Sequence, residues 1–247
     1  MAIYLYCVTE PTLQPPANLL GLAAAPVRAV AALGAAAWAS DLPADVGAVT
    51  PELARTHDLV VRAALALETP LPARFGQTFT DEGALRRSLD ARSARITRAL
   101  ERVRGAVEMT LRILLDEPVV GGRAERPTAS TVIARAAGAA EGGQGEGSGR
   151  AYLDWLRERQ HVAAEALTRA EFLQARVARA VLEIVREEAS SPPPPAARSL
   201  GIAHLLARGD VGRYRAAVHA MARREPPLRM MVSGPWAPYS FAGLTDG

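Results

Sequence analysis

The chain has 247 residues, of which 49% are hydrophobic, so it is long enough to bury the core of one or two domains. It contains 29 basic residues, all of them arginine, and 26 acidic residues, which gives a net charge of +3. A balance this close to neutral is weak evidence for nucleic-acid binding, which usually needs basic residues clustered on one face.

The first residues predict a buried β-strand. Residues 2–9 alternate and are rich in β-forming side chains, with Ile3, Leu5 and Cys7 facing one way. Cys7 is the only cysteine, which excludes an intramolecular disulfide, and its apolar neighbours favour a small core residue over a nucleophile. No charged and apolar leader precedes this strand, and no apolar run reaches the ~18 residues of a membrane span, so we expect a soluble, cytoplasmic protein.

Alanine-rich segments follow on either side of Gly34. Residues 26–33 and 35–41 predict a β-hairpin, although alanine is a poor strand former and propensity alone would favour a helix. A helix is then expected after Thr50, which suits the N-cap, with Pro51 at the first position. This helix should end before Thr69, and residues 71–79 predict a short strand.

The middle of the chain predicts a helix, a strand and a loop in turn. Residues 81–104 carry leucine, isoleucine and valine at helical spacing, and Gly105 is expected to end that helix. Alternating apolar and polar residues from Val107 to Ile113 predict a half-buried strand. Residues 117–149 include a glycine-rich tract that predicts a flexible loop.

The longest helical pattern covers residues 152–188, with apolar residues near heptad spacing. Such a helix projects beyond a small domain or pairs with residues 81–104 as an antiparallel coiled coil. Four prolines from Pro192 end it, after which residues 200–206 and 228–232 predict strands flanking a helix that starts at Gly209-Asp210. Strands and helices in both halves predict an α+β fold.

Four segments carry a resemblance to a known family. Residues Ser233–Phe241 read Ser-Gly-Pro-Trp-Ala-Pro-Tyr-Ser-Phe. They resemble the signature Ser-Gly-Pro-Trp-Pro-Pro-Tyr-Ser-Phe that closes gas vesicle proteins of the GvpL/GvpF family, with Ala237 in place of proline. Leu71–Gly76 and Gly105–Met109 are similar to two further family segments with one departure each, and Gly149–Leu153 resembles the start of the family's long helix.

The resemblance implies an N-terminal α+β domain with a modified ferredoxin-like fold over residues 1–105. It implies a mainly helical C-terminal domain over residues 106–247, with long coiled-coil-like helices and a small sheet. Family members are accessory or minor structural proteins of gas vesicle assembly. They are thought to bind the apolar shell protein GvpA and other Gvp proteins, in the cytoplasm or at the vesicle. Neither a small-molecule substrate, a membrane nor a nucleic acid is implied as a partner.

No catalytic, cofactor-binding or metal-binding residue is predicted. The histidines have no second histidine or cysteine at metal-ligand spacing, and they are His57, His161, His204 and His219. The absence of lysine excludes a P-loop ATPase. The carboxylate pairs Asp41/Asp45 and Glu187/Glu188 have no convergent partner in the sequence, which favours solvated charges.

Two groups of residues are candidates for binding a partner protein. Arg74, Phe75 and Gly76 place a donor fork, an aromatic ring and a flexible backbone together; alternatively, Phe75 is core and Arg74 pairs with a nearby acid. The second group is Trp236, Tyr239 and Phe241, since aromatic residues dominate interface energetics. For this group the favoured alternative is a proline-stiffened tail that buries the rings against a sheet.

Other functions stay open from the residues alone. Residues 86–104 contain seven arginines, so an Arg-rich regulatory or nucleic-acid-binding helix is the main alternative. Asp90 and Glu101 interleave with these arginines, which favours a solvated helix face. An unrecognised enzyme would need a polar pocket with perturbed side chains.

Overall fold

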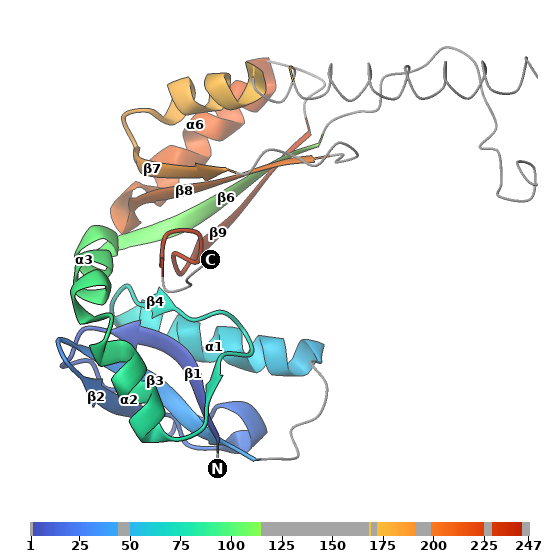
Figure 1. The fold of residues 1–247 in the computed structure, drawn as a ribbon. Coiled ribbons are helices and arrows are strands. Elements are labelled where there is room, and N and C mark those ends of the chain that lie inside the picture. Colours follow the sequence, from blue (N-terminus) through green and yellow to red (C-terminus); the bar gives the residue numbers. More distant parts are fainter. Residues whose placement is uncertain are drawn as a thin grey trace, which may run out of the picture.

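A computed structural model describes residues 2–43, 50–114, 168, 172–190, 199–224 and 229–243. In these residues the chain forms two antiparallel sheets, one above the other, with α3 (Ser93–Val103) leading from the first to the second and the C-terminal tail lying between them (Figure 1). The prediction of a mixed fold of helices and strands is confirmed. The predicted loop at 117–149 and the first part of the predicted helix from residue 152 lie outside the described residues.

The N-terminal sheet has the strand order β2-β3-β1-β4, and β5 also pairs with β1. Its strands are β1 (Ala2–Thr9), β2 (Arg28–Ala32), β3 (Ala35–Leu42), β4 (Leu71–Pro72) and β5 (Thr78–Phe79). The predicted hairpin is confirmed, and it turns at Gly34, whose φ of +74° favours glycine. Alanine is accepted in β3 because this strand lies between β1 and β2 and is covered on both faces. The predicted single strand over 71–79 is wrong, since two short strands flank a loop there.

Helices cover both faces of the N-terminal sheet. The helix α1 (Pro51–Leu67) begins as predicted, with the Thr50 side chain accepting from the backbone N–H of Leu53. It packs on the face that carries the tyrosines of β1, together with the 3-10 turn η1 (Leu22–Ala24). On the other face lie α2 (Glu82–Asp90) and α3.

The prediction of one continuous helix over residues 81–104 is wrong. The helix breaks at Ala91-Arg92, and the Arg92 guanidinium donates to the carbonyl of Ser88, 3.0 Å away. Apolar residues keep helical spacing across the break, so the pattern gives no sign of it. The buried leucines and isoleucine of α2 and α3 pack against the N-terminal sheet. Their apolar face is therefore not available for the predicted coiled coil, which is absent from the described residues.

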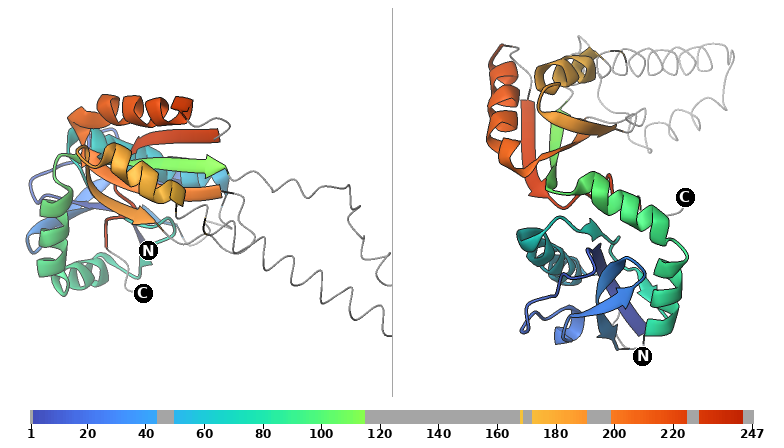
Figure 2. Two further views of the ribbon diagram at one scale, coloured as in Figure 1. Left: turned by 90° about the horizontal axis from the view of Figure 1, so that it is seen from above. Right: turned by 90° about the vertical axis from the view of Figure 1, so that its left-hand side faces the viewer.

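The C-terminal sheet has the order β7-β8-β6-β9, with all neighbours antiparallel. Its strands are β6 (Ala106–Leu114), β7 (Val185–Ser190), β8 (Ser199–Ala207) and β9 (Arg229–Trp236). The strands predicted from 107, 200 and 228 are confirmed, and β9 extends further, to Trp236. Two helices cover the face that points away from the N-terminal unit, namely residues 172–181 and α6 (Val211–Arg224), which follows the 3-10 turn η2 (Arg208–Asp210) (Figure 2).

The predicted extension of the long helix to Glu188 is wrong. The helical residues end at 181, and a turn leads into β7, where half-buried and exposed residues alternate. Residues 185–190 pair with β8 and complete the sheet, which compensates for the high helix propensity of their glutamates and arginine. In the described residues, the C-terminal half is therefore built around a four-stranded sheet.

Specific hydrogen bonds join the two halves. The Thr69 hydroxyl donates to the carbonyl of Ala106 over 2.8 Å, and the Arg208 guanidinium donates to the carbonyl of Leu65 over 2.6 Å. Two hydrophobic clusters also take residues from both sheets. The division at residues 105 and 106 stays a prediction.

Candidate protein-interaction site

The loop between β4 and β5 carries Arg74, Phe75 and Gly76. Both flanking strands pair with β1, so the loop leaves the edge of the sheet and returns to it. Gly76 has a φ of +89°, which favours glycine, and its N–H donates to the Tyr4 hydroxyl over 2.9 Å.

A buried chain of hydrogen bonds supports this loop from below. The His57 ring lies 3.2 Å through Nε2 from the carbonyl oxygen of Ala73, and 3.0 Å through Nδ1 from the Tyr4 hydroxyl. Because a carbonyl only accepts, Nε2 carries the proton and Nδ1 accepts from Tyr4. Burial lowers the pKa of His57 and raises the pKa of Tyr4 to about 12, so both groups are neutral at neutral pH. Their roles here are structural.

One side chain of the loop packs against the protein and another is exposed to solvent. Phe75 is partly buried and meets the rings of Tyr4 and His57 edge-on, with centroid distances of 6.2 and 5.7 Å. Arg74 is exposed, and the described residues offer it no ion-pair partner. Among the residues that the structure describes, the loop thus presents a guanidinium without an ion-pair partner beside a fixed aromatic ring.

The segment from Ser233 to Phe241 runs from β9 into the space between the two sheets (Figure 1). At Gly234, φ is +113°, and an added Cβ would lie 2.8 Å from the backbone oxygen of Glu108, so no other residue fits without a shift. Ala237 and Phe241 are each 3% exposed and belong to clusters that include residues of the N-terminal sheet. The position of Phe241 therefore agrees with the alternative of a tail that buries its rings against a sheet.

A buried carboxylate fixes the turn of this tail. Glu108 on β6 is 5% exposed and accepts two hydrogen bonds from Ser240, from its backbone N–H at 2.8 Å and from its hydroxyl at 3.0 Å. Burial raises the pKa of Glu108, and the bonds from Ser240 oppose this. The predicted alternation, which puts Glu108 with the exposed polar residues of a half-buried strand, is wrong at this position because the tail covers it. The signal was an acid in a strand whose neighbours are apolar.

The other two aromatic residues of the tail remain partly accessible. The Arg62 guanidinium of α1 lies 4.6 Å from the centroid of a Trp236 ring, and Tyr239 is 40% exposed. Burial and the Asp58 carboxylate raise the pKa of the Tyr239 hydroxyl. Phe75 and Ala237 pack on the same cluster, so the structure brings the Arg74 loop and the start of the tail to one region beside α1, whereas Phe241 packs in a different cluster.

Some of the other polar residues considered in the sequence have internal partners, whereas His219 is exposed, and His161 and Asp45 lie outside the described residues. His204 is buried, with Nδ1 at 2.8 Å from the Tyr214 hydroxyl and Nε2 at 3.3 Å from a carboxylate oxygen of Glu188. The expectation that Glu188 lacks a convergent partner is therefore wrong, because the turn after residue 181 brings it beside β8. Asp41 pairs with Arg28.

The described residues form neither a metal-binding cluster nor a helix that could span a membrane. Within the described ranges, no three histidine, cysteine or acidic side chains are close enough together to hold a metal ion. No helix in the same ranges is long and apolar enough to cross a membrane.

The two-sheet arrangement matches solved structures. The crystal structure of gas vesicle protein GvpF from Microcystis aeruginosa gives a TM-score of 0.74 at 17% identity, with 98% of both chains covered. That of GvpF from Anabaena sp. PCC7120 gives 0.73 at 18% identity, with 99% of this chain and 97% of the other covered. The class is thus an α+β protein with the fold of these GvpF structures.

Sequence comparison identifies the family to which the chain belongs. The model of the family described as "Gas vesicle synthesis protein GvpL/GvpF" matches residues 2–243, so the chain belongs to this family. Gas vesicle protein L of Streptomyces sp. (strain CB03234) is 31% identical over 205 residues, which is 79% of this chain and 70% of the relative. Gas vesicle protein F of the same strain is 27% identical over 246 residues, covering 98% and 99%. The resemblance seen in the sequence is confirmed.

Proposed function

We propose that this chain is a non-enzymatic assembly factor of gas vesicles that binds the shell protein GvpA and other Gvp proteins. The observation that carries the proposal is the family match over residues 2–243. The buried polar groups support it, since Tyr4, His57 and Glu108 all bond to other parts of the chain. The chain acts in the cytoplasm and at the growing vesicle, where it covers apolar shell protein before incorporation.

The proposed contact with the shell protein is the loop of Arg74, Phe75 and Gly76. A rigid loop loses little conformational freedom on binding, and the bonds from Gly76 to Tyr4 and from His57 to Ala73 hold it in place. Arg74 supplies donors for a carbonyl or carboxylate, and the exposed part of Phe75 supplies apolar contact.

The direct test mixes the full-length protein with GvpA diluted from denaturant and follows light scattering. We expect suppression of aggregation at about equimolar ratio. The Arg74→Ala variant should require a several-fold higher concentration, since interface arginines often contribute more than 1 kcal/mol. Arg98→Ala, which removes an exposed arginine from α3, is the matched control. Unchanged scattering with the wild-type protein would count against the proposal, as would intact vesicles in a deletion strain.

We further propose that the N-terminal sheet is a modified ferredoxin-like fold. Its strand order β2-β3-β1-β4, antiparallel throughout, is that of a β-α-β-β-α-β unit. The 3-10 turn η1 stands where the first helix of such a unit would lie, and α1 stands in the place of the second.

The alternative of nucleic-acid binding through residues 86–104 has less support. Three of its arginines form ion pairs, namely Arg86 with Glu82, Arg102 with Glu187 and Arg104 with Glu10. These pairs support a solvated helix face. A DNA mobility shift at low salt that weakens steeply as salt is added would favour the alternative.

A further inference from the structure

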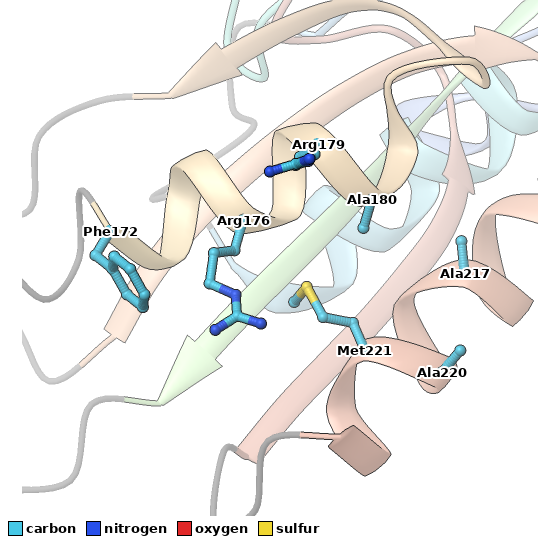
Figure 3. A pocket seen from close by; sticks show the side chains of 7 residues that line it. All are labelled: Phe172, Arg176, Arg179, Ala180, Ala217, Ala220 and Met221. Atoms are coloured by element: carbon cyan, nitrogen blue, oxygen red, sulfur yellow. The ribbon is translucent and has the colours of Figure 1, made fainter.

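A groove runs between the two helices that cover the outer face of the C-terminal sheet. Its volume is about 630 Å³. Figure 3 shows Arg176 extending from the helix of residues 172–181, and Met221 from α6, into the space between these helices. The groove lies on the side of the C-terminal sheet away from the N-terminal unit, so neither the Arg74 loop nor the tail borders it (Figure 1).

The groove is lined largely by small and adaptable apolar side chains. Ala180 lies on one wall and Ala217 and Ala220 on the other, so the backbone of an entering segment could come close to both helices. Met221 adapts its shape to a partner, and Phe172 is 58% exposed at one end. A wall of three helical turns matches the recognition mode in which a helix lays its apolar face into a groove.

Positive charge is concentrated on the two helices of the groove. Residues 172–181 and 211–224 contain six arginines and no aspartate or glutamate, and of these Arg213 pairs with Asp210 and Arg215 donates to the carbonyl of Gly234. The 29 arginines of the chain less these six leave 23, against 26 acidic residues, so the remainder is slightly acidic. Arg176 and Arg179 lie on the groove itself. The charge that complements this surface is negative.

We propose that this groove binds an amphipathic helix of a partner protein, with small or branched apolar residues on one face and glutamate or aspartate along the flanks. The apolar lining favours this occupant over nucleic acid, whose phosphates need cations but no apolar floor. It also favours a helix over an extended strand, since the groove is walled by helices and borders no sheet edge.

The test uses the full chain and a labelled synthetic helix of about 14 residues, with leucines at i, i+3, i+4 and i+7 and glutamates on the flanks. Binding is measured by fluorescence anisotropy. The same peptide with lysine for glutamate should bind at least about tenfold more weakly. Ala220→Glu, which places a carboxylate in the groove, should weaken the glutamate peptide at least about tenfold. Ala216→Glu adds the same charge to an exposed position of α6 outside the lining and should have little effect.

A charge exchange separates recognition from misfolding. Arg179→Glu should weaken the glutamate peptide several-fold and improve binding of the lysine peptide, which a misfolded protein would not do. Equal binding of both peptides, or equal effects of Ala220→Glu and Ala216→Glu, would overturn the proposal. So would displacement of the peptide by a short DNA duplex at physiological salt, or self-association in sedimentation that Ala220→Glu abolishes. The peptide-binding experiment contains no shell protein, so a negative result leaves the proposed binding of the shell protein intact. A negative result with the shell protein likewise leaves the groove proposal intact.

Discussion

Replacing Glu108 by alanine should loosen the C-terminal tail from the body of the protein. The carboxyl group accepts two hydrogen bonds from Ser240, at 2.8 and 3.0 Å, and removing one partner of a buried hydrogen bond costs about 1–3 kcal/mol. Ser240 is itself exposed, so water replaces part of what its donors lose. We therefore expect Glu108→Ala to lower the free energy of unfolding by about 2–4 kcal/mol.

Urea unfolding followed by tryptophan fluorescence measures this change, since Trp38 lies in the N-terminal core and Trp236 on β9. Ser240→Ala removes only the hydroxyl bond, and the double variant with Glu108→Ala should show a coupling of about 1 kcal/mol. A loss below about 0.5 kcal/mol for Glu108→Ala, or strict additivity in the cycle, would refute the role of this bond.

The pH dependence of the free energy of unfolding gives a second test, and its direction follows from the raised pKa of Glu108. Burial raises the pKa of Glu108 in the folded state, so the neutral acid favours folding. The contribution of this group to stability is complete below the unfolded pKa and is lost as the pH rises through the folded pKa. Glutamine has no charge to bury; its amide oxygen can accept from the backbone N–H of Ser240, and its amide N–H can donate to the Ser240 hydroxyl oxygen. Glu108→Gln should therefore gain stability relative to the wild type between pH 4.5 and 8, and a flat or falling difference would contradict the assignment.

Three further outcomes are expected. Gly234→Ala should lower the free energy of unfolding by more than about 2 kcal/mol, because its φ is positive and the new methyl group meets the backbone of β6. The control Gly209→Ala has open space around the new methyl group, so it should change the free energy of unfolding by less than about 1 kcal/mol. Equilibrium unfolding measures both variants. Cys7 should resist Ellman's reagent in the native protein and react once urea unfolds it, because the thiol is buried and burial raises its pKa; rapid native reaction would show an open N-terminal sheet. Arg208→Ala should cost about 1–2 kcal/mol through its lost bond to the carbonyl of Leu65, and an unchanged urea midpoint would contradict that bond.

Local sequence patterns predicted much of the fold in segments where the apolar residues follow one period, either that of a strand or that of a helix. The hairpin around Gly34 and the strand from Val107 follow from turn chemistry and alternation. The break at Ala91-Arg92 could not be seen, because the buried residues on either side keep the spacing of an unbroken helix. Residues 185–190 alternate with period two, but that pattern lies at the end of a helical one and is made of good helix formers. Pairing with β8, a tertiary effect, decides their state.

The candidate site also has a part that the sequence predicts and a part that it does not. The sequence pointed to Arg74 and Trp236 through their motifs, but not to the groups that position them. His57 lies 16 residues from Ala73 along the chain and hydrogen-bonds to it, and Glu108 lies 132 residues from Ser240. Such long-range bonds leave no local spacing to recognise. Only the fold brings them together.

The buried tail also has a consequence for synthesis. Ala237 and Phe241 complete hydrophobic clusters whose other members come largely from the first hundred residues. The N-terminal half emerges from the ribosome first, yet part of its apolar surface stays uncovered until residues 237–242 have been synthesised and have folded back. A chain that terminates before residue 237 would keep that surface exposed to proteases and chaperones. The segment Ser233–Phe241 therefore also distinguishes chains that have reached Phe241 from chains truncated before it.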